Sequence, residues 1–121
     1  MLYCLFLFFS SCIDMSEQKI TGPYYVSSDP AAPYKTLYYE LPEAVMVERI
    51  TNVERVGYTN DFIFAESEGN FYYIIRAKDI PSYLGDPRVE AAISRPLSEV
   101  QFLNVLDSLR LKNFSFQYSA I

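Results

Sequence analysis

The sequence lacks histidine and tryptophan altogether, and it has only two cysteines, Cys4 and Cys12, among 121 residues. Without histidine the chain can form neither a Ser-His-Asp triad nor a Cys–His pair. Two cysteines near the N-terminus also leave too few ligands for zinc, haem or an iron–sulfur cluster. We therefore expect no metal and no cofactor, and we predict that the protein is not an enzyme.

Positive charge is also scarce. Ten Lys and Arg residues against fifteen Asp and Glu give a formal net charge of −5 at pH 7, and the basic residues form no cluster. Nucleic-acid binding requires a basic stripe that neutralises phosphates, so we expect no nucleic-acid partner. An anionic membrane surface would repel this balance. A hydrophobic content of 50% nevertheless predicts a folded chain, and its length fits one domain.

A short apolar run near the N-terminus predicts a leader. Residues 2–9 are all apolar, the length of a secretory signal core, whereas a spanning helix needs about 20 apolar residues. The alternative, a buried strand, would rarely end in Ser10-Ser11-Cys12. The segment Phe9-Ser10-Ser11-Cys12 resembles the lipobox of bacterial lipoproteins. This resemblance implies that the Cys12 thiol receives a diacylglyceryl group and that cleavage removes residues 1–11.

Such an anchor gives the chain a predicted location and organisation. Two acyl chains hold a protein stably at a bilayer without any charge attraction. We therefore expect a protein of the bacterial cell envelope, with residues 1–11 as signal peptide, residues 12–19 as lipidated cysteine and tether, and residues 20–121 as one globular domain. The membrane is then one partner, reached through the lipid.

The remaining chain favours an α+β fold. Eleven tyrosines and nine phenylalanines suit pleated, half-buried surfaces. Apolar runs between turn residues predict strands at 24–27, 36–41, 53–58, 62–66 and 71–76, with a last one at 114–118; residues 44–50 fit a strand or a helix start. A proline after Asp86 predicts a short helix that ends by 95–96, and Ser98 with Gln101 predicts a capping box for a helix over 99–110. We predict a mainly antiparallel sheet of four to six strands with one or two helices from the C-terminal half packed on it.

Part of this pattern resembles a known group of proteins. Val56-Gly57-Tyr58, then residues 60–65 (NDFIFA), then Tyr72-Tyr73-Ile74-Ile75 is similar to a hairpin pattern in small, functionally uncharacterised bacterial lipoproteins. The similarity spans roughly residues 20–77. It implies an envelope-anchored domain and supplies no catalytic residue.

Gly57, inside a strand, predicts a β-bulge.

Two sets of residues are candidates for function. Tyrosine pairs occur at 24–25, 38–39 and 72–73, and each pair must place one ring on each face of a sheet. An uncovered outer face would be an aromatic surface suited to a protein partner or to carbohydrate; the alternative is that a helix or loop covers it. The candidate binding surface comprises Tyr24, Tyr25, Tyr38, Tyr39, Tyr72 and Tyr73.

The second set consists of carboxylates. Asp61 with Glu66 or Glu68 could do acid–base chemistry on a sugar if the side chains converged, but solvated turn residues are the simpler interpretation. We therefore expect a non-catalytic, protein-binding envelope domain. The alternatives are a small enzyme or ligand-binding domain acting on cell-wall sugar or peptide, and an immunity-type inhibitor of a secreted toxin.

Overall fold

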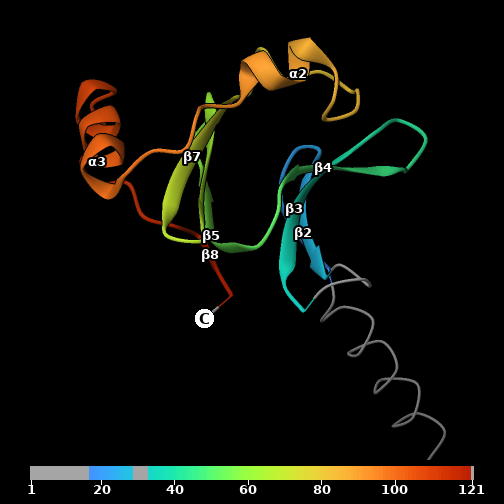
Figure 1. Cartoon of the computed structure of the whole chain (residues 1–121), viewed down its shortest axis with the longest axis horizontal. Helices are drawn as coiled ribbons and strands as arrows, with labels where there is room; N and C mark the ends of the chain where they lie inside the picture. The colour runs from blue at the N-terminus through green and yellow to red at the C-terminus, as the bar shows by residue number, and fades with distance from the viewer. Residues whose placement is uncertain (1–16, 29–32, 121) are drawn as a thin grey trace, which may run out of the picture.

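The computed structural model describes residues 17–28 and 33–120, and within them the chain forms two antiparallel sheets (Figure 1). The first sheet has the order β1-β2-β3-β4, so each strand pairs with its neighbour in sequence. Its strands are β1 (Glu17–Thr21), β2 (Tyr24–Ser28), β3 (Lys35–Glu40) and β4 (Met46–Ile50).

The second sheet has the order β7-β6-β5-β8. Short turns at residues 59–61 and 68–69 force its first three strands to pair as a meander. Its strands are β5 (Val53–Tyr58), β6 (Phe62–Ser67), β7 (Asn70–Ile75) and β8 (Tyr118–Ser119), and the helices are α2 (Pro87–Ala92) and α3 (Glu99–Ser108).

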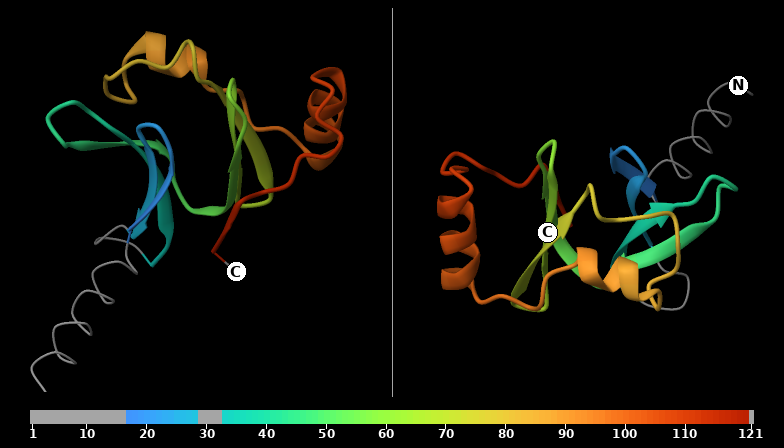
Figure 2. Two further views of the ribbon diagram at one scale, coloured as in Figure 1. Left: turned by 180° about the vertical axis from the view of Figure 1, so that it is seen from behind. Right: turned by 90° about the horizontal axis from the view of Figure 1, so that it is seen from above.

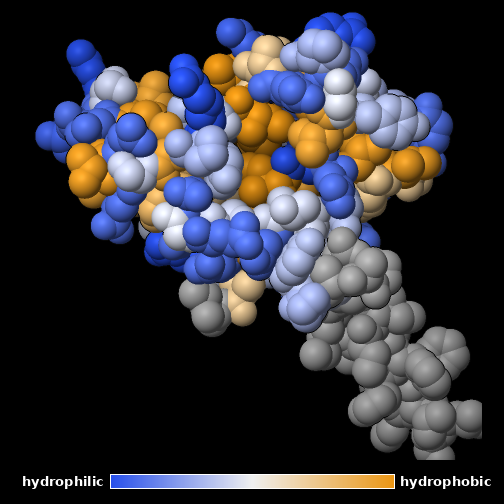
Figure 3. All heavy atoms as spheres, viewed as in Figure 1, coloured by the Kyte–Doolittle hydropathy of each residue, from blue (hydrophilic) through white to orange (hydrophobic). Residues whose placement is uncertain are grey.

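The elements stack in three layers, with the second sheet in the middle (Figure 2). One core lies between the two sheets and includes Val26, Leu37, Val56 and Ile63; apolar side chains are visible in this space in Figure 3. The other core lies between the second sheet and α3. Burial on both faces explains why β6 has consecutive buried apolar residues instead of an alternating pattern.

Both helices begin as their sequences predict. The Ser98 hydroxyl accepts a hydrogen bond from the Gln101 backbone, and the Gln101 side chain accepts one from the Ser98 backbone, which confirms the capping box. Asp86 caps α2, and Val89 and Ala92 turn inward at the end of the molecule above the two sheets (Figure 1).

The edges of the second sheet are closed by irregular chain. Segment 93–97 bonds along β7, with backbone bridges at Phe71–Leu97 and Ile74–Ile93. Beyond the short β8, the side-chain amide of Gln117 continues the ladder: Tyr58 N–H donates to Oε1 at 2.9 Å, and Nε2 donates to the Tyr58 carbonyl at 3.2 Å. These contacts satisfy backbone groups that would otherwise offer a free edge.

The structure confirms the α+β class and the helix packed on a sheet, and it corrects several details. Residues 17–19 belong to β1, so the predicted tether over 12–19 is wrong at its end. The strand predicted at 114–118 shrinks to Tyr118–Ser119, because Phe114 and Phe116 instead pack against the core under α3. In the described part of the chain, no helix is long and apolar enough to cross a membrane.

Gly57 has a packing role and not the predicted bulge, which lies between Val53 and Arg55. A β-carbon at Gly57 would lie 2.4 Å from Cζ of Phe114 and 2.8 Å from Oε1 of Gln117. The missing side chain therefore makes room for the segment that closes this sheet edge.

We expect Gly57→Ala to destabilise the domain by about 1–3 kcal/mol, because the Phe114 ring must move out of a filled core. Urea unfolding followed by circular dichroism measures the change. Gly85→Ala is the control, since no atom lies within 4 Å of its added methyl group, and it should stay within about 0.5 kcal/mol of wild type. Equal stability of the two variants would contradict this role.

Candidate functional site

Cys12 lies outside the described residues, so its lipidation stays a prediction. The leader at residues 1–11, with the lipobox segment, lies outside them as well, whereas the candidate tyrosines and carboxylates all lie within the described ranges. The described ranges bring together no group of three or more His, Cys, Asp or Glu side chains able to hold a metal ion.

The six tyrosines do not form one surface. Tyr24 is only 2% exposed and packs edge-to-face against Tyr39, with ring centroids 5.4 Å apart, so both rings lie on the inner face of the first sheet. Tyr24 is therefore not available to a partner, which corrects its place in the predicted surface. Tyr25 and Tyr38 are opposite each other across β2 and β3 and lie half-buried on the outer face.

On the second sheet the tyrosine pair is covered from both sides. Tyr72 packs against the core between the sheets, and Tyr73 packs against the core under α3. The alternative given in the sequence analysis, that another element covers the face on which a tyrosine ring lies, is therefore correct for this sheet. The predicted in–out alternation is correct for each pair, but only Tyr25 and Tyr38 share an outer face.

Asp61 also lies apart from both Glu66 and Glu68. Asp61 precedes β6 and Glu68 follows it, so the strand separates them by roughly 20 Å. Glu66 is within β6 and forms an ion pair with the Arg55 guanidinium. They cannot face one sugar together, as a glycosidase pair requires.

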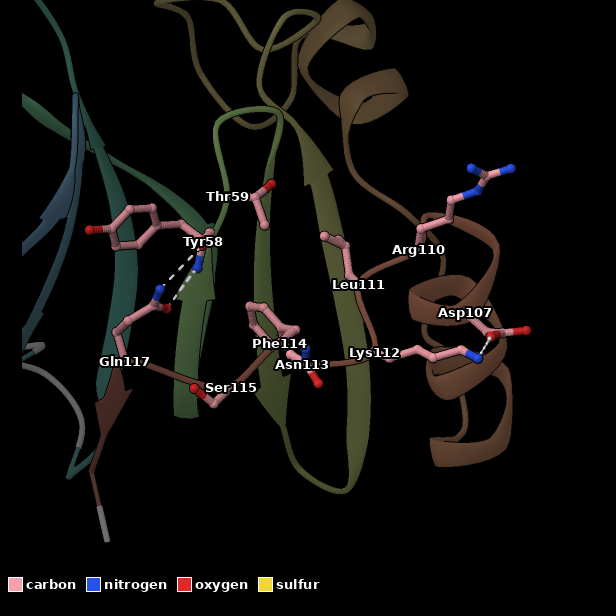
Figure 4. A pocket seen from close by; sticks show the side chains of 10 residues that line it. All are labelled: Tyr58, Thr59, Asp107, Arg110, Leu111, Lys112, Asn113, Phe114, Ser115 and Gln117. Atoms are coloured by element: carbon pink, nitrogen blue, oxygen red, sulfur yellow. Dashed lines mark hydrogen bonds and ion pairs between the residues drawn. The ribbon is translucent and has the colours of Figure 1, made fainter.

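A cavity of about 760 Å³ lies where the chain leaves α3 and passes the end of β5 (Figure 4). The Arg110 side chain points away from it, and Lys112 pairs with Asp107 at 3.9 Å (Figure 4). The Gln117 amide is already bonded to Tyr58. These three side chains therefore contribute little to ligand binding in this hollow, which leaves the neutral side chains of Asn113 and Ser115.

A cluster of buried charge lies at the other side of the molecule. Arg49, on β4, and Asp79, in the loop after β7, have fully buried side chains that form an ion pair. Nε of Arg49 lies 3.1 and 3.0 Å from the two carboxylate oxygens, and the Tyr24 hydroxyl donates to Oδ2 at 2.8 Å. The guanidinium also lies 4.6 Å from the centre of the Tyr39 ring. We call these residues, Arg49, Asp79, Tyr24 and Tyr39, the Arg49–Asp79 cluster.

A β-bulge aims Arg49 inward. Tyr38 pairs with Glu48 and Leu37 with Ile50, which leaves Arg49 as the extra residue of β4. Such a residue escapes the strict alternation of side chains between faces. Arg49 therefore joins Ile50 on the inner face.

The cluster fixes a surface loop, residues 76–86. One Arg49 nitrogen, Nη2, donates to the carbonyls of Ile80 (2.9 Å) and Ser82 (3.1 Å), and Asp79 Oδ1 accepts from the Ile80 backbone at 3.0 Å. Further along, the Ser82 hydroxyl donates to Asp86 at 2.8 Å, and the Asp86 backbone donates to the Tyr83 carbonyl. The loop is held at both ends, and the Tyr83 side chain between them is 66% exposed.

This loop lies at the end of the molecule that we call the distal end, with the turns at 22–23, 41–45 and 59–61. The backbone N–H of Arg76 donates to the Asp61 carbonyl, and the backbone N–H of Glu40 donates to the Pro23 carbonyl. Pro81 and the 41–45 turn line a hollow of about 290 Å³. Val45 is a second exposed apolar side chain at this end.

Sequence reasoning missed this site. Arg49 and Asp79 are 30 residues apart and neither lies in a motif. The available signal was a basic residue inside an apolar strand, Val47-Glu48-Arg49-Ile50, which is unusual unless the charge is paired.

We expect Asp79→Asn to destabilise the domain by about 3–5 kcal/mol, because it leaves the Arg49 guanidinium buried without a counter-charge. Urea unfolding at pH 7 measures the change. The control is Asp107→Asn, whose partner Lys112 is largely in solvent and whose loss should alter stability by less than about 0.5 kcal/mol. A similar small effect at Asp79 would contradict the role of the cluster.

Alkaline pH should also destabilise the fold. Burial and then the hydrogen bond to Asp79 raise the pKa of Tyr24, and burial raises the pKa of Tyr39 and Tyr118. Their unfolded pKa is near 10, so the unfolded chain loses protons first, and stability that is fully present below pH 10 falls above it. Tyr24 alone should contribute about 1.4 kcal/mol per pH unit to this fall.

Unfolding free energies measured between pH 9 and pH 11.5 test this dependence. Tyr24→Phe should be less stable than wild type at pH 8 and should show a shallower decline above pH 10. A wild-type curve that stays flat through pH 11.5 would be inconsistent with the burial of these hydroxyls.

Comparisons with known proteins name no family for this chain: no protein-family model matches it, and neither the curated proteins nor the solved structures contain a match. The resemblance to bacterial lipoproteins stays a prediction.

Proposed function

We propose that this protein is a lipid-anchored component of the bacterial cell envelope whose domain binds another protein through the loop that presents Tyr83. The observation that carries the proposal is an exposed aromatic side chain on a loop fixed by buried charge. Tyrosine is among the residues that dominate binding energy at protein interfaces. A loop that is already ordered loses little conformational entropy on binding.

The cost of the Arg49–Asp79 cluster supports this role. Removing two charges from water costs several kcal/mol per ion, and apolar side chains of similar volume would often stabilise the fold as well or better. The benefit that such a cluster gives here is one defined geometry for residues 79–82. Backbone geometry that is fixed beside an exposed aromatic residue is useful for recognition.

The direction in which β1 runs also supports a binding site at the distal end. Cys12 precedes β1, and β1 runs from Glu17 toward the turn at 22–23 at the distal end. A lipid on Cys12 would hold the start of β1 near the bilayer. Tyr83 and Val45 would then face away from the membrane, where a soluble or periplasmic partner can reach them.

The anchor has its own test. Mass spectrometry of the N-terminus of the protein isolated from its own envelope should find a first residue Cys12 carrying a diacylglyceryl group, and Cys12→Ala should abolish the modification. A polypeptide that begins at Met1 with a free Cys12 thiol would overturn the anchored half of the proposal.

The binding surface is tested by affinity capture from detergent-solubilised envelope with three baits. Wild type and Leu103→Ala should capture the same protein, while Tyr83→Ala should reduce capture at least about tenfold, the loss of a binding residue worth 1.4 kcal/mol. Leu103 is the matched control because it is 55% exposed on α3, away from the loop.

The captured protein is then purified and titrated against each bait. Equal affinity of wild type and Tyr83→Ala, or a loss caused by Leu103→Ala instead, would contradict binding through the Tyr83 loop.

A further inference from the structure

The distance between Cys12 and the domain is short enough to fix which end meets the membrane. This inference rests on the proposed lipid anchor. Cys12 and Glu17, the first residue of β1, are five positions apart, a span of at most about 18 Å when fully extended. A domain of this size has a radius of gyration of about 13 Å, so such a tether is shorter than the domain is wide.

The end that the tether holds, which we call the proximal end, can be identified from strand pairing. Glu17 pairs with Ser27, and Ser28 pairs with Lys35. The turn between β4 and β5 at residues 51–52 lies at this end, as does Ala120, whose N–H donates to the Glu54 carbonyl at 2.8 Å. The distal turn at 59–61 is separated from 51–52 by the whole length of β5, roughly 20 Å.

The proximal end contains a cavity of about 480 Å³, lined by Ser28 at the end of β2 and by residues of three further segments. Tyr34 and Lys35 enter β3 on one side, Asn52 and Glu54 flank the start of β5 on the other, and Ala120 comes from the C-terminal segment. Nζ of Lys35 donates to the Ser28 hydroxyl at 2.8 Å, which holds the ammonium group at the rim. Lys35 and Glu54 form no ion pair with each other or with any other described residue.

We propose that the proximal end lies on the bilayer and that this cavity receives a zwitterionic phospholipid headgroup. The Lys35 ammonium matches the phosphate, and the Glu54 carboxylate matches the ethanolamine or choline cation. Tyr34, which also lines the cavity, is an aromatic residue of the kind that binds such cations. One unpaired charge of each sign suits a zwitterion. A purely anionic headgroup would match only Lys35 and would meet a chain of net charge −5.

The test places one thiol at each end of the domain. Thr51→Cys is proximal and Asn60→Cys is distal; both residues are exposed turn residues at opposite ends of β5. In the processed lipoprotein the new cysteine is the only free thiol, because Cys4 leaves with the leader and Cys12 carries the lipid. Each thiol is labelled with a bimane fluorophore, and the protein is reconstituted into phosphatidylcholine vesicles that contain a headgroup-spin-labelled lipid as quencher.

We expect the label at position 51 to be quenched at least threefold more than the label at position 60. Replacing half of the phosphatidylcholine by phosphatidylglycerol should reduce quenching at 51. Adding Lys35→Gln with Glu54→Gln should reduce it at least twofold in phosphatidylcholine. The matched control removes the exposed charge pair at the other side of the molecule, Asp107→Asn with Lys112→Gln, and should leave quenching unchanged.

The possible results distinguish the anchor, the orientation of the domain and the headgroup site from one another. Protein that does not float with the vesicles overturns the anchor and this inference together. Protein that floats with equal quenching at 51 and 60 overturns the orientation and leaves the anchor standing. Strong quenching at 51 that neither lipid composition nor the Lys35→Gln and Glu54→Gln pair alters overturns the headgroup site.

Discussion

The buried ion pair between Arg49 and Asp79 is the constraint on which the distal end of the molecule depends. It joins β4 of the first sheet to the loop that follows β7 of the second sheet. Charge can be stable there only because the groups around it are satisfied: the guanidinium reaches the carboxylate and three backbone carbonyls, and the carboxylate also accepts from Tyr24 and from the Ile80 backbone. The bulge in β4 is what makes this geometry possible.

A second constraint is the middle position of the second sheet. Because it is covered by the first sheet on one face and by α3 on the other, its strands tolerate few polar side chains. Two charged side chains that the strands do carry, Arg55 and Glu66, neutralise each other on the α3 face, where the Arg55 guanidinium lies 4.6 Å from the centre of the Phe116 ring. The two surfaces that we propose for binding therefore lie at the two ends of the strands.

The elements that the sequence predicts best are those defined by local contacts. The meander from Val53 to Ile75 and the capping box at Ser98 depend on short turns and on neighbours three residues away, so both were predictable. The first strand was not predictable, because Glu17, Gln18 and Lys19 form an exposed edge with no apolar alternation.

The division into two sheets and the contact between Arg49 and Asp79 depend on residues that are tens of positions apart in sequence, and periodicity contains no information about such contacts. Alternation predicted that each tyrosine pair would split between faces, but which ring turns inward is decided by tertiary packing.

The amide of Gln117 has a consequence for edge-to-edge association between copies of this domain. A side chain, and not a neighbouring strand, occupies the hydrogen-bonding groups of Tyr58, so the edge is blocked without offering a new row of donors and acceptors beyond it. A longer final strand would only move the row of unpaired backbone N–H and C=O groups outward. Ending the sheet with a single amide stops its growth, which matters for a protein that an anchor would confine at high local density in two dimensions.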